Sequence, residues 1–177
     1  MDGELLIDRI DSDIGTILVV SDGRSLCAVD YAGYERRMMS LLRARHRDVR
    51  LIDRADPAGV SSRIRAYLAG DHRAIDDVPV ETGGTPFQRR VWAALRAIPA
   101  GTTVTYGGLA ARLDGPAACR AVGRANALNP VAIVVPCHRI VGSGGSLTGY
   151  AGGLDRKRWL LEHEGVSLPG ARKDPFP

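Results

Sequence analysis

The chain of 177 residues contains very little lysine. Lysine occurs only as Lys157 and Lys173, whereas Lys and Arg together number 24, so almost all of the basic charge is arginine. A bias of this kind raises the arginine count without any ligand. The sequence pI of about 9.2 therefore does not by itself establish a nucleic-acid partner.

Cysteine is also scarce. Cys27, Cys119 and Cys137 are odd in number and widely spaced, which fits neither a disulfide framework nor a CxxC metal site. We expect reduced thiols in an intracellular setting, with no metal and no cofactor. No apolar run approaches the ~20 residues of a membrane span, and residues 1–4 lack the basic flank of a secretory signal. These absences predict a soluble, cytoplasmic protein.

Charge is unevenly divided along the chain. The formal net charge is +4, but residues 1–86 carry a net −3 and residues 87–166 a net +6. A polyanion-binding half joined to a non-binding half has such a distribution. The length allows one domain with a full core or two small domains, and we expect two.

The first part of the chain predicts a small α+β domain over residues 1–80. Short apolar runs separated by turn residues predict strands at residues 5–10, 16–20 and 26–29, which form a β meander. Apolar positions at helical spacing follow, and they predict helices over residues 34–46 and 58–69. Residues 81–84, which include two glycines, are the expected linker.

Residues 85–166 predict a mainly helical domain, followed by a loosely held tail over residues 167–177. Thr85 before Pro86 is an expected helix N-cap, and Thr105 is the expected cap of the next, shorter helix. The first of these helices has one apolar stripe, made of Phe87, Val91, Trp92, Leu95 and Ile98. Asp155 is the expected cap of a last helix with Trp159, Leu160 and His163 on its apolar side and Glu164 near its end.

A tight turn at residues 114–116 leads from the Thr105 helix into a helix over residues 117–128. Two short helices around a glycine-containing turn predict a helix-turn-helix. One face of the second helix is small and apolar, comprising Ala117, Ala118, Ala121, Val122 and Ala125. Arg120 and Arg124 lie one turn apart on another face. The pattern alone fits equally a packed alanine-rich helix with two solvated arginines and a helix that presents basic side chains to a ligand.

Cys137 follows the apolar, strand-like residues 133–135 and Pro136, and it precedes His138 and Arg139. The thiolate is the nucleophilic form of cysteine, whose unperturbed pKa is ~8.5, and a neighbouring cation or base increases its population. The alternative is a cysteine that only fills the core.

The wider pattern around Cys137 resembles the O6-alkylguanine-DNA alkyltransferases, also called methylated-DNA–protein-cysteine methyltransferases. The resemblance covers about residues 85–166. The matching motifs are Thr85-Pro86-Phe87-Gln88, Val104-Thr105-Tyr106-Gly107, Arg120-Ala121-Val122-Gly123, Asn129-Pro130, the Cys137 run, Gly149-Tyr150-Ala151-Gly152-Gly153-Leu154 and His163-Glu164-Gly165. It implies a ribonuclease-H-like first domain and a winged-helix-like helix-turn-helix in the second.

The resemblance also implies the reaction and its partner, double-stranded DNA that contains O6-alkylguanine. The helix-turn-helix would enter the minor groove, and Arg120 would fill the space left by the extruded nucleotide. Tyr106 would crowd the 3′ phosphate and offer its hydroxyl to guanine N3. Cys137 would take the alkyl group irreversibly, so that each molecule acts once. We expect a monomer, which could bind DNA cooperatively.

Further residues take their roles from the same resemblance. His138 would act as a base through a water molecule, and Glu164 would orient its imidazole. Asn129 would bridge the turn before Cys137 by bonding both the backbone and the thiol. It could also, or instead, cap the end of the preceding helix. The other substrate or DNA contacts would be Tyr150, Ala151, Gly123 and Arg139. Many family members have Ser where this chain has Ala151. Alanine keeps only the backbone N–H as a donor, so the range of alkyl groups that the protein accepts stays open.

Two other functions remain open at this stage. A cysteine-dependent hydrolase could use Cys137 and His138, but it would turn over and would need an oxyanion hole, for which the glycine-rich loop at residues 143–153 is the one candidate. A non-catalytic helix-turn-helix protein would instead bind selected sequences through base contacts in the major groove.

Overall fold

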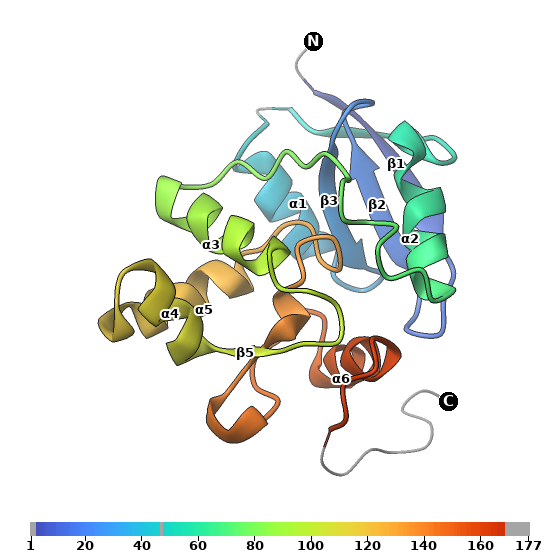
Figure 1. The fold of residues 1–177 in the computed structure, drawn as a ribbon. Helices are drawn as coiled ribbons and strands as arrows, with labels where there is room; N and C mark the ends of the chain where they lie inside the picture. The colour runs from blue at the N-terminus through green and yellow to red at the C-terminus, as the bar shows by residue number, and fades with distance from the viewer. Residues whose placement is uncertain (1–2, 47, 169–177) are drawn as a thin grey trace. The chain divides into compact units, whose positions relative to one another are not determined.

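The structure is a computed structural model, and it describes residues 3–46 and 48–168. The chain forms two compact units (Figure 1). The first contains the chain up to Gly84 together with Pro130–Val134, and the second contains Thr85–Asn129 and the chain from Val135 onward. The sequence pattern assigns residues 130–134 to the second domain, but they belong to the first unit. Of the expected tail, residues 169–177 lie outside the described part.

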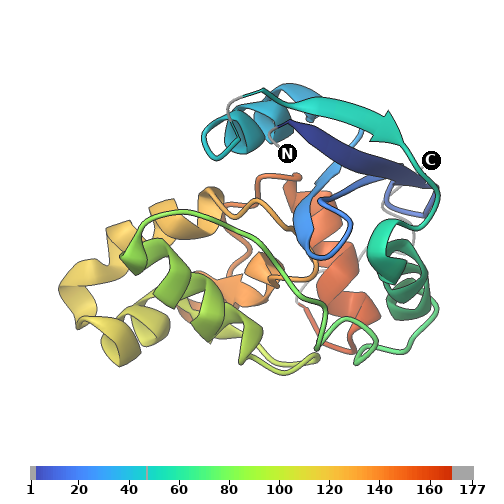
Figure 2. The same cartoon turned by 90° about the horizontal axis from the view of Figure 1, so that it is seen from above.

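Four strands form the sheet of the first unit, in the order β3-β2-β1-β4. Strands β1 (Glu4–Ile10), β2 (Ile17–Ser21) and β3 (Leu26–Tyr31) pair antiparallel, which confirms the predicted meander. The fourth strand, β4 (Arg50–Asp53), was not predicted and pairs parallel to β1, with Leu51 opposite Leu5. Figure 2 shows this teal strand beside dark-blue β1 at the edge of the sheet.

Helices α1 (Glu35–Arg43) and α2 (Val60–Leu68) complete the first unit, and a short 3-10 turn at Pro57–Gly59 precedes α2. Met38 and Leu42 of α1 pack on one face of the sheet, against a cluster that includes Leu5, Ile7, Leu18 and Val20. Every residue of β2 is buried, so both faces of this strand are covered. Cys27 lies in the same cluster and is a core residue, as its sequence context predicts.

Residues 130–134 attach to β3 through a single bridge between Val131 and Val29, and then turn sharply. The backbone N–H of Val134 donates to the carbonyl of Ala132 at 2.8 Å, and Ile133 between them has φ +69°. This left-handed conformation is rare for a β-branched residue. The prediction of a strand before Cys137 is therefore wrong. The segment is apolar and buried, but it forms a turn.

The second unit begins with α3 (Pro86–Arg96), whose N-terminus is as predicted. Thr85 and Gln88 form a reciprocal capping box, in which each side chain accepts from the other residue's backbone N–H. Val91, Trp92 and Leu95 are buried on its inner face. Ile98 is also buried but lies after the end of the helix, so the predicted helix was too long there.

The helix-turn-helix consists of α4 (Tyr106–Leu113) and α5 (Cys119–Ala127). Thr105 caps α4 as predicted, since its hydroxyl accepts from the N–H of Gly108 at 3.0 Å. A 3-10 turn at Pro116–Ala118 precedes α5, where the sequence predicts helix. The predicted inner face of α5 needs correction, because Val122, Ala125 and Asn126 are buried whereas Ala121 is exposed.

Short elements complete the second unit. Strands β5 (Val104–Thr105) and β6 (Ile140–Val141) pair parallel, and 3-10 turns occupy Cys137–Arg139 and Ser143–Gly145. Helix α6 (Leu154–His163) ends the described fold, and its N-cap is Gly153. Asp155 lies within the first turn, so its predicted capping role is wrong. The two units together confirm the α+β class. No described helix is long and apolar enough to cross a membrane.

Candidate active site around Cys137

A tight backbone turn places Cys137 in the second unit. Pro136 has φ −80° and ψ +66°, and the N–H of Cys137 donates to the carbonyl of Val135 at 2.8 Å. This is the geometry of an inverse γ-turn, which the fixed φ of proline favours. The Cys137–Arg139 turn then leads into β6. Cys137 is 5% exposed, so little of the residue meets solvent.

His138 is fully buried, and its Nε2 lies 2.9 Å from Glu164 Oε1. Burial lowers the pKa of His138, and this effect exceeds the opposing effect of the Glu164 carboxylate. The imidazole is therefore neutral at pH 7 and, with Glu164 ionised, donates its Nε2 proton to that carboxylate. Nδ1 is then the basic nitrogen, and it is buried without a hydrogen bond to any described residue. His138 is thus arranged to accept a proton at Nδ1.

Arg139 supports Glu164 from the other side. Its Nη2 donates to Oε1 at 2.8 Å, its Nε donates to Oε2 at 3.0 Å, and its Nη1 donates to the carbonyl of Ile98. Burial alone would raise the pKa of Glu164, but the bonds from His138 and Arg139 hold it well below its usual range. Arg139 itself is buried, and these bonds give it a supporting role in the structure; its contact with substrate or DNA stays a prediction.

The backbone of Gly101 also contacts Glu164. Its backbone N–H donates to Glu164 Oε2 at 3.4 Å. Its φ is +78°, and a Cβ at this position would lie 2.9 Å from the Glu164 carbonyl oxygen. Glycine is required here by both the conformation and the close approach.

Asn129 holds the turn that leads to Cys137. Its buried Nδ2 donates to the carbonyl of Val135 at 2.8 Å, which is the predicted backbone bond. The C-cap of α5 is Leu128, so the alternative interpretation of Asn129 as the cap is wrong. Its contact with the thiol stays a prediction.

Tyr106 begins α4 and faces the loop that follows β6. Its hydroxyl lies 3.4 Å from the carbonyl oxygens of both Thr148 and Gly149. Burial, followed by the charges of the nearby Cys137 and Cys119, raises the pKa of Tyr106. The phenol therefore remains a proton donor at neutral pH. A Cβ on Gly123 of α5 would lie 3.8 Å from its ring, so the predicted substrate or DNA contact Gly123 lies beside Tyr106.

Lys157 of α6 is a site residue that the sequence patterns did not reveal. It is fully buried, and its ammonium donates to the carbonyls of Ile140 at 2.5 Å, Thr148 at 2.8 Å and Gly149 at 3.3 Å. Burial lowers its pKa to about 8, against an attraction to Cys137 that raises it. The side chain joins the end of the Cys137 turn to the loop that carries Tyr150 and Ala151. The one available signal was its rarity in an arginine-rich chain.

Comparison with known proteins agrees with this geometry. Residues 86–166 match the family model described as the DNA-binding domain of 6-O-methylguanine DNA methyltransferase, and residues 6–82 match its ribonuclease-like domain. The methylated-DNA–protein-cysteine methyltransferase of Salmonella typhimurium is 49% identical, over 93% of this chain and 98% of that protein. The chain belongs to this methyltransferase family. The resemblance seen in the sequence motifs is thereby confirmed.

Solved structures of other family members are similar over most of their length. The structure of Mycobacterium tuberculosis OGT in complex with DNA is 38% identical, with a TM-score of 0.76 over 90% of this chain and 93% of that one. The O6-methylguanine-DNA methyltransferase of Pyrococcus kodakaraensis is 27% identical, with a TM-score of 0.70 over 92% and 99%. Both domains of the methyltransferase family are thus present in this chain.

Not all predicted residues of the methyltransferase site lie in this buried network. Tyr150 and Ala151 are half-buried in the loop before α6, and their contacts with a base stay predictions. Arg120 is exposed on α5. The chain's expected lack of a metal also stays a prediction, although no group of three or more His, Cys, Asp or Glu residues is placed to hold an ion in the described ranges.

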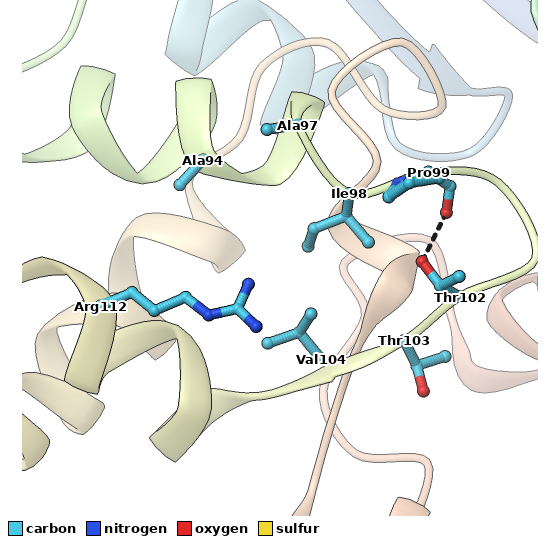
Figure 3. Close-up of a pocket in the computed structure, with 8 residues that line it drawn as sticks. All are labelled: Ala94, Ala97, Ile98, Pro99, Thr102, Thr103, Val104 and Arg112. Carbon is cyan, nitrogen blue, oxygen red and sulfur yellow. Dashed lines mark hydrogen bonds between the residues drawn. The ribbon is translucent and has the colours of Figure 1, made fainter.

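The second unit also has a cavity of about 270 Å³, which none of the predicted site residues lines. The residues around it are Ala94, Ala97, Ile98, Pro99, Thr102, Thr103, Val104 and Arg112. Figure 3 shows Arg112 extending from α4 into this space, and Thr102 donating to the carbonyl of Pro99. The cavity is therefore distinct from the surroundings of Cys137.

Proposed function

We propose that this chain repairs O6-alkylguanine in double-stranded DNA by transferring the alkyl group to Cys137. The observation that carries the proposal is the network around the thiol, in which the residue after Cys137 has a free basic nitrogen and a second nitrogen bonded to buried Glu164. Membership of the methyltransferase family supports the same activity.

The chemical step is one displacement. The sulfur of Cys137 attacks the alkyl carbon, a sulfur–carbon bond forms, and the bond from that carbon to guanine O6 breaks. The thiol proton passes to His138 Nδ1 through a water molecule, and guanine finally regains one proton. Glu164 stabilises the imidazolium formed in between, with Arg139 and Gly101 holding the carboxylate in place. The product thioether has no good leaving group, so each molecule acts once.

Tyr106 acts on the departing guanine. Its raised pKa keeps the hydroxyl protonated, so it can donate to guanine N3 as negative charge develops on the base. Tyr150 walls the pocket, and the Ala151 amide faces O6. Lys157 positions this loop relative to the Cys137 turn through its three carbonyl bonds.

The helix-turn-helix binds the DNA in this proposal. It enters the minor groove, and Arg120 occupies the place of the rotated nucleotide. Extruding a base costs a few kcal/mol and is easier where alkylation has weakened pairing. The protein acts as a monomer in the cytoplasm, with no cofactor.

The decisive experiment is an intact-mass measurement after incubation with duplex DNA that contains O6-methylguanine. We expect one added methyl group, mapped to Cys137, and a plateau at one equivalent of repaired base. Cys137→Ala abolishes transfer but keeps DNA binding, whereas Cys119→Ser, which changes another free thiol, transfers normally. Product formation beyond one equivalent would indicate a hydrolase, and DNA binding without an adduct would indicate a non-catalytic binding protein.

A further inference from the structure

The exposed side of α5 contains a second arginine beside Arg120. Val122, Ala125 and Asn126 are buried, whereas Arg120, Ala121, Arg124 and Ala127 are exposed. At roughly 100° per residue, these four exposed positions span about 120° of the helix, and Arg124 lies near the middle of that arc. The flanking alanines are small, so a ligand can approach this face closely. Arg124, and not Arg120 alone, therefore dominates the exposed face.

The charges on this face have no partner within the described chain. Helix α5 contains no acidic residue, and neither the Arg120 nor the Arg124 side chain forms a hydrogen bond or ion pair with any described residue. Like charges four positions apart on a helix repel each other. Some other arginines of this unit are paired, as Arg90 is with Asp114 and Arg158 with Glu162. The exposed face of α5 is thus arranged for an anionic ligand.

Helix geometry indicates which part of DNA Arg124 meets. Arg124 is about 6 Å further along the axis than Arg120 and is rotated by about 40°. A helix with side chains is roughly 10–12 Å wide, whereas the minor groove is about 6 Å wide, so only one edge of α5 enters the groove. If Arg120 points to the floor of the groove, a side chain rotated away from it reaches the rim, where the phosphates lie.

We propose that Arg124 binds a backbone phosphate of the DNA, one helical turn from Arg120. This proposal rests on the proposed function, because it assumes that α5 docks on DNA. Arg124 anchors the helix and contributes to affinity for any sequence, damaged or not. Arg120 acts only where a nucleotide is rotated out. The two arginines of α5 therefore divide binding and extrusion between them.

The test measures binding to an undamaged duplex over a range of salt concentrations. The slope of log K against log salt is negative, and loss of one phosphate contact makes it less steep by about 0.9. At 0.1 M salt this corresponds to an affinity about eightfold weaker. We expect this change for Arg124→Ala. Arg124→Lys should largely retain the wild-type slope, since a phosphate accepts either cation. The matched control is Arg158→Ala, which removes an arginine of α6, outside the helix-turn-helix, that pairs with Glu162 and should leave the slope unchanged.

A second measurement separates this proposal from the proposed function. At saturating O6-methylguanine DNA, Arg124→Ala should transfer at the wild-type rate, whereas Arg120→Ala should transfer slowly. A wild-type salt slope for Arg124→Ala, or equal losses for the Ala and Lys variants, would overturn the phosphate contact while leaving alkyl transfer intact. Failure of the wild-type chain to form the Cys137 adduct would instead overturn the proposed function.

Discussion

At the scale of single residues, Lys157 shows how one buried charge organises a site. Its three carbonyl partners are Ile140 of β6 and Thr148 and Gly149 of the loop between β6 and α6. A compact ammonium with three donors suits three oxygens around one point, whereas the planar fork of arginine does not. This difference explains why a chain with 24 Lys and Arg residues, nearly all arginine, has a lysine here.

Replacing Lys157 by Met should therefore slow alkyl transfer much more than it weakens DNA binding. The volume remains similar, but the three carbonyls lose their common donor, and a displacement of about 1 Å in a reacting group can cost on the order of 100-fold in rate. Single-turnover rates at saturating DNA, together with equilibrium binding, provide the measurement.

Two further variants refine the Lys157 experiment. Lys157→Arg keeps the charge and should recover little of the rate. Arg158→Met, at the next position on α6, should transfer normally, because its guanidinium pairs with Glu162 of the same helix. If Lys157→Met had a wild-type transfer rate, the proposed positioning role would be wrong.

At the scale of helices, Gly123 is expected to favour alkyl transfer at a cost in stability. Glycine within a helix costs about 1 kcal/mol relative to alanine. The Cβ of Gly123→Ala would meet the Tyr106 ring at 3.8 Å, an ordinary contact that causes no clash but fills space beside the ring. We expect a gain of up to about 1 kcal/mol in the free energy of unfolding, together with slower alkyl transfer.

Urea unfolding and single-turnover transfer measure the two effects of Gly123→Ala. The control is Gly107→Ala in α4, where an added Cβ meets nothing within 4 Å, so transfer should be unchanged. A Gly123→Ala protein that is more stable and transfers at the wild-type rate would show that this glycine is not needed for function.

The elements that sequence predicts well are those that local interactions determine. Thr85 and Thr105 cap helices through bonds within three residues, and both were predicted. Strand β4 was missed because it has only four residues and its partner β1 lies more than 40 positions earlier. The sequence around the Ile133 turn predicts a strand, because buried apolar residues follow the same pattern in strands and in buried turns.

The residues of the site likewise fall into those that the sequence predicts and those that it does not. The resemblance to known alkyltransferases indicated Cys137, His138 and Glu164, but it did not indicate that Arg139 pairs with Glu164. The structure buries that guanidinium against Glu164. Which basic side chains are buried depends on tertiary packing, and neighbouring residues in the sequence do not determine it. Lys157 was missed for the same reason.

At the scale of the whole molecule, the buried His138 and Glu164 couple folding to pH. The folded chain keeps His138 neutral because burial lowers its pKa, whereas the unfolded chain protonates it near pH ~6.5. Below that pH the unfolded state binds more protons, so stability decreases as pH falls from about 6.5 towards the lowered pKa of the folded state. The lowered pKa of Glu164 acts in the same direction, but only as pH falls below its unfolded value of about 4.3.

Between pH 6.5 and 5, the effect of His138 on stability is therefore separated from that of Glu164. We expect the free energy of unfolding of the wild-type chain, measured in urea, to fall there with a slope that exceeds that of His138→Gln by up to about 1.4 kcal/mol per pH unit. Glutamine does not titrate but can still donate to Glu164, so the buried carboxylate and Arg139 remain paired in this variant. Equal slopes for the two proteins would mean that the folded state protonates His138 as readily as the unfolded chain, and a neutral imidazole could not then be the proton acceptor in this range.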